Sequence, residues 1–221
     1  MYKKELAYYF ASPVAYFVVG LYLLAVSLFL WVIPGQWNIV ESGYAQTDGL
    51  FQLSPWLMML LCPALTMRLF AEERQTGTWN LLIAKRIPVW RIVVSKFFAA
   101  WTLTVIAILP CVVHFFLVSS IAEPAGNVDA AQFAGSMMGL VFLSLSFTAI
   151  GLMTAATTRS QIVAFILGAV VSFALYWVLI QSHYTSISRG VIDLRDVVFF
   201  LSVAVIGIVL TIVIIERITK K

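Results

Sequence analysis

The chain has 221 residues, of which 62% are hydrophobic and 11% are charged, and its net charge is +4 at pH 7. A soluble domain could not hide so much apolar surface, because folded proteins of this length leave about a quarter to a third of the chain's surface in water. The basic residues form short groups between apolar stretches, which argues against nucleic-acid binding and indicates an integral membrane protein.

The first segment, from Tyr2 to Ala11, predicts a short helix at the membrane interface. Leu6, Tyr9 and Phe10 would share one side of this helix, away from the charged residues at positions 3–5. A frayed tail is the alternative interpretation.

Six apolar stretches are long enough to cross a bilayer, because a hydrocarbon core about 30 Å thick needs about 20 helical residues. These stretches are Val14–Ile33, Leu50–Met67, Phe97–Ile121, Phe133–Thr158, Ile162–Ile180 and Val197–Ile215, and none contains Asp, Glu, Lys or Arg. Ser12 and Pro13 supply a cap-like residue and a first helical residue for span one, and Pro55, Pro63 and Pro110 are expected to start or bend helices. The predicted fold is all-α, with one membrane domain over residues 1–221.

The distribution of Lys and Arg predicts the topology. With a cytoplasmic N-terminus, only Arg189 and Arg195 lie outside the cell. The inside segments then hold the other basic residues, which are Lys3, Lys4, Arg68, Arg74, Lys85, Arg86, Arg91, Lys96, Arg159, Arg217, Lys220 and Lys221. The positive-inside rule and the even number of spans therefore both place the two termini in the cytoplasm.

The segment from Arg68 to Lys96 is the longest predicted cytoplasmic stretch. We expect span two to continue as helix to about Gln75, Gly77 to stop it, and Thr78 to cap a short helix from Trp79 to Ala84. Pro88 would then open a third helix that runs into span three. The apolar side chains of Leu81, Leu82 and Ile83 are not stabilised by contact with water, so we expect the segment to dock on a protein or to lie on lipid. A solvated connector is the alternative.

The sequence lacks the groups that direct chemistry or ion coupling would need. His114 is the only ionisable residue inside a span apart from tyrosine and cysteine, and we interpret it as a packed, hydrogen-bonded residue. Glu72 and Glu73 are neighbours and would point about 100° apart on a helix, so they do not form a catalytic pair. A Gly-x-x-x-x-Gly-Lys-Ser/Thr loop is missing. We assign no catalytic, cofactor-binding or metal-binding residue.

Small residues and charges mark two further places. Gly135 with Gly139, and Gly151 with Ala155, have the spacing that lets membrane helices approach closely, either within the chain or between subunits. The predicted external segment 188–196 mixes basic and acidic side chains, which an ion-paired surface turn would explain.

The segment between spans two and three also resembles a known family. Glu72 and Glu73, then Thr76-Gly77-Thr78, then the pair Leu81-Leu82, are similar to the first cytoplasmic loop of type-2 ABC transporter permeases, and the likeness continues at Trp90, Ile92 and Lys96. In that family this loop forms a coupling helix that fits a cleft in the ATPase subunit. The resemblance therefore implies that the seven residues from Glu72 to Leu82 named above couple the chain to an ATPase. It also implies that Arg189, Asp193, Arg195 and Asp196 contribute to an outer gate with short re-entrant helices.

The order of motifs along the chain narrows the resemblance. The segments 33–39, 54–73, 126–129, 147–152, 160–165 and 187–196 are similar to the gliding-motility-associated ABC permease of Bacteroidota. That likeness implies a multi-pass protein of the bacterial inner membrane, a partner ATPase that binds the ATP, a second permease copy or related permease, and a companion membrane protein with an extracytoplasmic domain.

From the sequence we expect a permease subunit of an ATP-driven ABC exporter, associated with gliding motility or secretion, without enzymatic activity of its own. The alternative function is a membrane anchor or assembly factor of a motility or secretion machine that transports no substrate itself.

Overall fold

The computed structural model describes residues 1–79, 87–124, 127–190 and 193–219. Within these ranges every regular element is helical. Six helices are long and apolar enough to cross a membrane, and they are Pro13–Trp31, Asp48–Gln75, Val89–Ile121, Ala130–Thr157, Gln161–Ile187 and Leu194–Thr219. Each predicted span lies inside the observed helix to within two residues. The predicted all-α fold with six spans is therefore confirmed.

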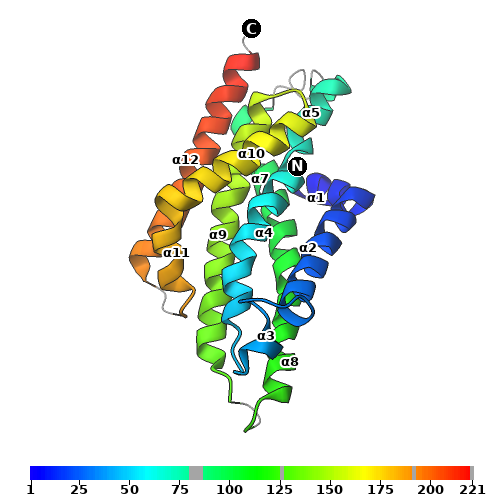
Figure 1. Cartoon of the computed structure of the whole chain (residues 1–221). Helices are drawn as coiled ribbons and strands as arrows, with labels where there is room; N and C mark the ends of the chain where they lie inside the picture. The colour runs from blue at the N-terminus through cyan, green and yellow to red at the C-terminus, as the bar shows by residue number, and fades with distance from the viewer. Residues whose placement is uncertain (80–86, 125–126, 191–192, 220–221) are drawn as a thin grey trace.

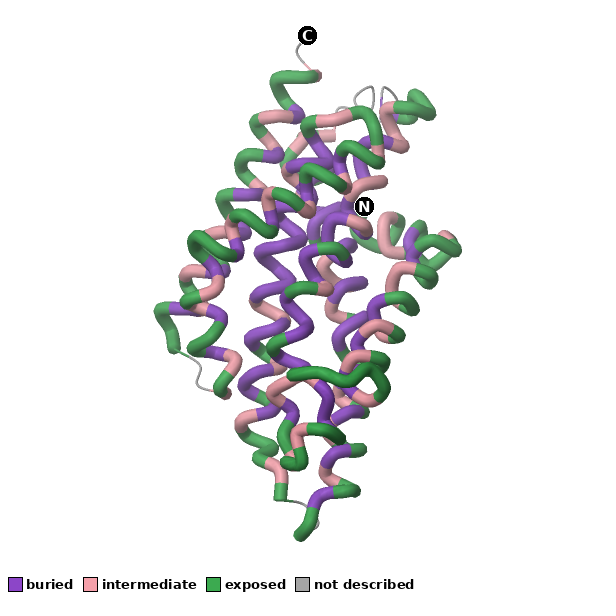
Figure 2. Tube along the Cα trace, in the orientation of Figure 1, coloured by how far each residue is buried: buried purple, intermediate pink, exposed green. Residues whose placement is uncertain are grey.

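One helix, α9 (Ala130–Thr157), occupies the middle of the bundle (Figure 1). It packs against α4 (Asp48–Thr66), α7 (Val89–Ile108), α10 (Gln161–Leu175) and α12 (Leu194–Thr219). Within the most apolar 18-residue stretch of each span, 72% of the residues of α9 are buried inside the protein and 67% of those in the span that contains α4. The corresponding share in the other four spans is 22–33%. Figure 2 shows the buried residues running along these inner helices.

The outer helices turn large apolar side chains away from the protein. Phe17 on α2 (Pro13–Trp31) is 71% exposed, and Ile162 and Val178 are 71% and 76% exposed. Side chains of this kind cover much of the outer surface of the bundle, whereas soluble monomers rarely expose large continuous apolar patches. The lipid acyl chains are the solvent that these faces fit.

Small residues bring the inner helices close together. A Cβ added at Gly151 would meet Thr66 and Pro63 of α4, and one added at Gly135 would lie 2.5 Å from the carbonyl oxygen of Gly190. Both small-residue pairs predicted from the sequence therefore include a glycine that packs inside the chain.

Spans three and five depart from a regular α-helix. A short 3₁₀ segment, η1 (Leu109–Cys111), interrupts span three at Pro110, and α8 (Val112–Ile121) completes the span. A π segment, η2 (Tyr176–Ile180), joins α10 to α11 (Gln181–Ile187), so span five extends seven residues past its predicted end. Pro110 thus lies where the α-helix of span three is interrupted, whereas Pro55 and Pro63 lie inside α4.

The helix α1 (Tyr2–Ala11) is confirmed as a helix and runs across the bundle beside α2 and α7 (Figure 1). We call the end of the bundle formed by residues 1–12, 66–79, 87–96, 156–162 and 213–219 the basic end. The opposite end, formed by residues 33–50, 119–124, 127–132, 182–190 and 193–196, is the far end. The far end also holds α3 (Ile39–Ser42), a short helix that the sequence did not predict and that the Asn38 side chain caps.

Candidate coupling site

The helix α5 (Arg68–Gln75) carries span two beyond the apolar part of the bundle, as the sequence predicted. The backbone N–H of Met67 still bonds to the Pro63 carbonyl at 2.9 Å, so α5 follows α4 without an intervening loop. Leu69, Phe70 and Ala71 are buried and anchor α5 on the rest of the chain. Motion of α5 is therefore directly linked to span two.

The end of α5 is closed by the Thr76-Gly77-Thr78 motif. Gly77 has φ +74°, the left-handed conformation that glycine adopts without strain, so the predicted helix stop is confirmed. The Thr76 hydroxyl donates to the Glu72 carbonyl at 2.9 Å and lies 3.0 Å from the Thr78 hydroxyl. The Thr78 hydroxyl donates back to the Glu73 carbonyl at 3.4 Å. The Thr78 side chain thus bonds to the end of α5, whereas the sequence predicts that it caps the following helix.

Glu73 is held by a buried lysine. The Lys96 ammonium of α7 donates to a Glu73 carboxylate oxygen at 2.7 Å and to Glu5 of α1 at 3.2 Å. Lys96 is only 1% exposed, and its ammonium also lies 5.7 Å from the centre of the Phe70 ring. A buried cation of this kind is retained only when it is well paired. This cluster, Glu5–Lys96–Glu73, joins α1, α5 and α7.

The next residue, Arg74, joins α5 to the central helix. Its guanidinium donates to the Ala156 carbonyl at 2.9 Å and to the Thr158 carbonyl at 3.4 Å, where α9 ends. Carbonyl groups at a helix C-terminus lack helical partners and carry partial negative charge, so a cation is favourable there. Gln75 adds a bond to the Arg159 carbonyl at 3.1 Å. The last turn of α5 therefore caps α9.

The first turn of α5 contacts the junction between α1 and α2. Arg68 lies 3.2 Å from Glu72 and donates to the Ser12 hydroxyl at 3.0 Å. Ser12 thus accepts a bond from α5, while Pro13 occupies the first position of α2 as predicted. Burial and the neighbouring Glu72 carboxylate raise the pKa of the Tyr8 phenol on α1 to about 12. The phenol therefore stays protonated beside the Arg68–Glu72 pair.

The predicted coupling residues differ in their surroundings. Glu72 and Glu73 are half-buried within the chain, whereas Thr76, Gly77 and Thr78 are exposed at the surface of the basic end. Leu81 and Leu82, and most of the predicted helix Trp79–Ala84, lie outside the described residues. The described part of that helix begins at Thr78 and Trp79, and the Trp79 ring packs edge-on against Phe70 with centroids 6.2 Å apart. The helix α7 then starts at Val89, directly after Pro88.

The predicted outer-gate residues lie at the far end but do not form one cluster. Asp196 is buried and lies 2.7 Å from Nδ1 of His183, whose ring stacks on Phe199. Asp193 accepts a bond from the Arg195 backbone N–H at 2.9 Å and so caps the start of α12. In the described ranges, neither Arg189 nor Arg195 lies within ion-pairing distance of an acid, so the expected ion-paired turn is wrong there. The segment α11 follows η2 without an intervening loop and so prolongs the helix of span five.

Sequence reasoning missed the residues that pair with the predicted site. Glu5 and Arg74 counted only toward the charge of a segment or the topology, Lys96 belonged to the family resemblance but had no predicted partner, and neither had His183. A lysine one residue before a predicted span was the available signal, because a cation so close to the hydrocarbon needs a partner.

The interpretation of His114 as a packed, hydrogen-bonded residue is confirmed, since it packs in the chain and accepts a bond from the Trp31 indole at 3.0 Å.

In this arrangement the charged groups pair with one another and with helix ends instead of converging on an open site. In the described ranges no three His, Cys, Asp or Glu side chains come together as metal ligands. What the site provides is a short helix, α5, bonded to α1, α7 and α9 at once.

A comparison with protein-family models places the chain. The model of the ABC-2 family transporter protein matches residues 36–192, which include α3 to α11 and therefore α5 with its partners on α7 and α9, but not those on α1. A search of curated proteins finds no match. The family match covers well over half of the 221 residues. With its six apolar helices, the chain therefore belongs to the ABC-2 family of transporter proteins and is a membrane permease component.

Proposed function

We propose that the chain is the permease subunit of an ATP-driven exporter and that a separate ABC ATPase docks on the segment around residues 76–88. The observation that carries this proposal is the bonding of α5 to α1, α7 and α9 through Lys96 and Arg74. A connector that only joined two spans would gain nothing from burying a lysine between two carboxylates. A lever that must move several helices together needs such bonds.

Glu72 and Glu73 take a different role in this proposal from Leu81 and Leu82. The two leucines, which the sequence places between charged flanks, form the docking surface. Glu73 connects that surface to the bundle, because its carboxylate is occupied by Lys96 inside the chain. Closure of the ATPase would push the docked segment, and α5 would pass the displacement to the spans.

The rest of the assembly follows the same proposal. The sequence lacks a phosphate-binding loop, so the partner binds and hydrolyses the ATP. Both termini lie in the cytoplasm of a bacterial cell and the spans cross its inner membrane, since the basic residues gather at one end. A second copy or a related permease completes the transport path, because the interior of one chain is filled by α4 and α9. We further propose that the permease works with a companion membrane protein that has an extracytoplasmic domain. The whole complex would serve gliding motility or secretion.

Affinity purification of the tagged chain from its native membranes tests the partner. We expect an ABC ATPase to co-purify, and Leu82→Asp to remove it. An unpaired carboxylate buried in the ATPase cleft would cost about 3 kcal/mol or more, which weakens binding roughly 100-fold. Val40→Asp is the matched control, because Val40 is an apolar far-end residue that is 64% exposed. It should leave the ATPase bound.

The outcome separates the proposal from the alternative function. If the wild-type chain brings down no ATPase, or if Leu82→Asp retains it at normal membrane abundance, the docking assignment is wrong. A chain that instead brings down only structural proteins of a motility or secretion machine would be an anchor.

A further inference from the structure

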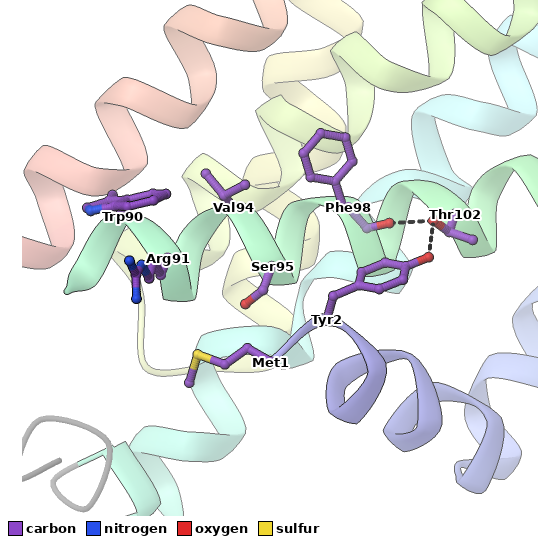
Figure 3. A pocket seen from close by; sticks show the side chains of 8 residues that line it. All are labelled: Met1, Tyr2, Trp90, Arg91, Val94, Ser95, Phe98 and Thr102. Atoms are coloured by element: carbon purple, nitrogen blue, oxygen red, sulfur yellow. Dashed lines mark hydrogen bonds between the residues drawn. The ribbon is translucent and has the colours of Figure 1, made fainter. Parts of the chain in front are cut away.

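A groove of about 420 Å³ opens at the basic end between the start of α1 and the first half of α7 (Figure 3). One of its walls is a strip of side chains spaced four residues apart on α7, namely Trp90, Val94, Phe98 and Thr102. Residues with this spacing lie on one face of a helix. The groove therefore runs along α7 and not across it.

The strip is apolar and open. Trp90 is 51% exposed and Phe98 is 44% exposed, so the rest of the chain leaves much of each uncovered. Phe98 belongs to predicted span three, and Trp90 lies two turns before it, outside the span. The groove thus passes from the edge of the bundle into the hydrocarbon region.

The deep end of the groove is closed by a hydrogen bond. The hydroxyls of Tyr2 and Thr102 lie 2.9 Å apart. Figure 3 draws this bond as a dashed line. Thr102 donates its own proton to the Phe98 carbonyl at 2.7 Å, so Tyr2 is the donor to Thr102. Because these two hydroxyls are already hydrogen-bonded, an apolar group at the deep end would not leave either of them without a partner.

The shallow end carries an unneutralised cation. Arg91 lines the groove, and its guanidinium lies 5.3 Å from the centre of the Trp90 ring. In the described ranges no carboxylate lies within 4 Å of it, and residues 80–86 contain neither Asp nor Glu. Arg68 and Lys96 at the same end are both paired with acids. The charge on Arg91 is therefore left for a partner outside the chain.

The occupant must be anionic at one end and apolar at the other. Arg91 and Thr102 are eleven residues apart, a rise of about 16 Å along α7. We propose that the groove binds an anionic glycerophospholipid, with its phosphate at Arg91 and an acyl chain along Val94 and Phe98. A second protein copy would not need this gradient from charge to hydrocarbon. Only the choice of leaflet rests on the proposed topology, which places this lipid in the cytoplasmic leaflet.

Binding there would tie α1 to α7, the same two helices that Lys96 joins to α5. A lipid headgroup would thus sit next to the coupling site. An anionic membrane would then hold α1 in place, and a zwitterionic one would not.

Native mass spectrometry of the purified full chain, without the ATPase, tests the proposal. The chain is mixed in detergent with equal amounts of a phosphatidylglycerol and a phosphatidylcholine that have the same acyl chains. We expect the wild type to retain phosphatidylglycerol about fivefold more, the change typical of one arginine at an anionic surface. Arg91→Gln should abolish this preference and Arg91→Lys should keep most of it. Arg195→Gln, at an exposed far-end arginine, is the matched control and should bind as the wild type does.

A second variant tests the groove itself. Val94→Trp would fill it and should lower the retention of both lipids. If Val94→Trp fails to fold, Arg91→Gln still tests the role of the charge, because we expect its thermal unfolding to match that of the wild type. The proposal is overturned if the wild type shows no headgroup preference, or if Arg91→Gln keeps it. It is also overturned if Val94→Trp converts a dimer into a monomer without changing lipid retention, because the groove would then be a contact between copies. Since no ATPase is present, a failure here leaves the proposed docking untouched.

Discussion

The two ends of the bundle are held together by different chemistry. At the basic end, side chains bond across long sequence separations, as in Lys96 with Glu5 and Arg74 with Ala156. At the far end, many side-chain bonds are local caps, such as Asn38 at α3 and Asp129 at α9, beside a few long-range bonds, such as the one that the Gln132 amide donates to Asp48. The far end is also closed by backbone contact, because Gly190 approaches Gly135 and Gln132 too closely for a side chain.

This difference implies different mechanical behaviour. Charged groups that bond to several helices pass a displacement among them, and each bond can exchange partners as the helices move. Close backbone contact through glycine has no such freedom, since any shift opens a gap or makes a clash. The basic end is therefore suited to receiving movement, and the glycine contact at the far end to holding α9 and the α11–α12 connection in register.

The strongest test of the comparison removes the cation of the basic end. Lys96→Met leaves Glu5 and Glu73 without their buried partner, so we expect the free energy of unfolding to fall by about 3–5 kcal/mol. Equilibrium unfolding in mixed micelles measures it. Adding Glu73→Gln to Lys96→Met should restore part of the loss. Arg195→Met, at an exposed far-end cation, should unfold like the wild type, and equal stability of Lys96→Met would contradict the cluster's role.

A single methyl group tests the far end. In Gly135→Ala the new Cβ would lie 2.5 Å from the Gly190 carbonyl oxygen, so the backbones must separate. Overpacking of this kind costs about 1–3 kcal/mol. Gly20→Ala is the matched control, because nothing lies within 4 Å of its Cβ position and alanine favours a helix by about 1 kcal/mol. If Gly135→Ala is as stable as Gly20→Ala, the glycine contact is not what closes this end.

The link between α5 and the central helix should have a smaller effect on stability than on function. Arg74→Gln loses the charge that caps the end of α9, and we expect a loss of about 1–2 kcal/mol. In the assembled complex it should keep the ATPase but reduce transport per ATP hydrolysed. Arg159→Gln removes a neighbouring exposed arginine side chain and should change neither quantity. Normal transport in Arg74→Gln would show that α5 acts through α1 and α7 alone.

The smallest effect separates a cap from a gate. Asp193→Ala removes the acceptor for the Arg195 N–H and should cost about 1 kcal/mol, while Asp193→Ser keeps a capping oxygen and most of the stability. Thermal unfolding and transport are measured on the same preparations. Transport that falls in Asp193→Ser at wild-type stability would support the outer-gate prediction, and transport that follows stability would reduce Asp193 to a cap.

Hydrophobic length and charge placement were enough to predict the six spans, because contact with lipid depends on composition alone. They could not predict which side chains meet. Lys96 and Glu5 are 91 positions apart, and nothing local to either residue specifies the other. Helix irregularities were partly predictable: Pro110 marks the 3₁₀ segment, but no proline or glycine marks the π segment at Tyr176–Ile180. The site was thus predicted as a segment, and its internal bonds were not.

The central position of α9 has a consequence for biosynthesis. Its main neighbour α12 is made after it, so α9 enters the membrane while the face that will meet α12 is still uncovered. Thr148 already has its partner then, because it donates to the Ser144 carbonyl in the same helix at 2.7 Å. Ser146 does not, since its hydroxyl donates at 3.2 Å to the Phe200 carbonyl of α12. Until Phe200 is made, the Ser146 hydroxyl would therefore have to donate to a carbonyl of α9 itself, and it would exchange that bond for the one to α12 when the two helices pack.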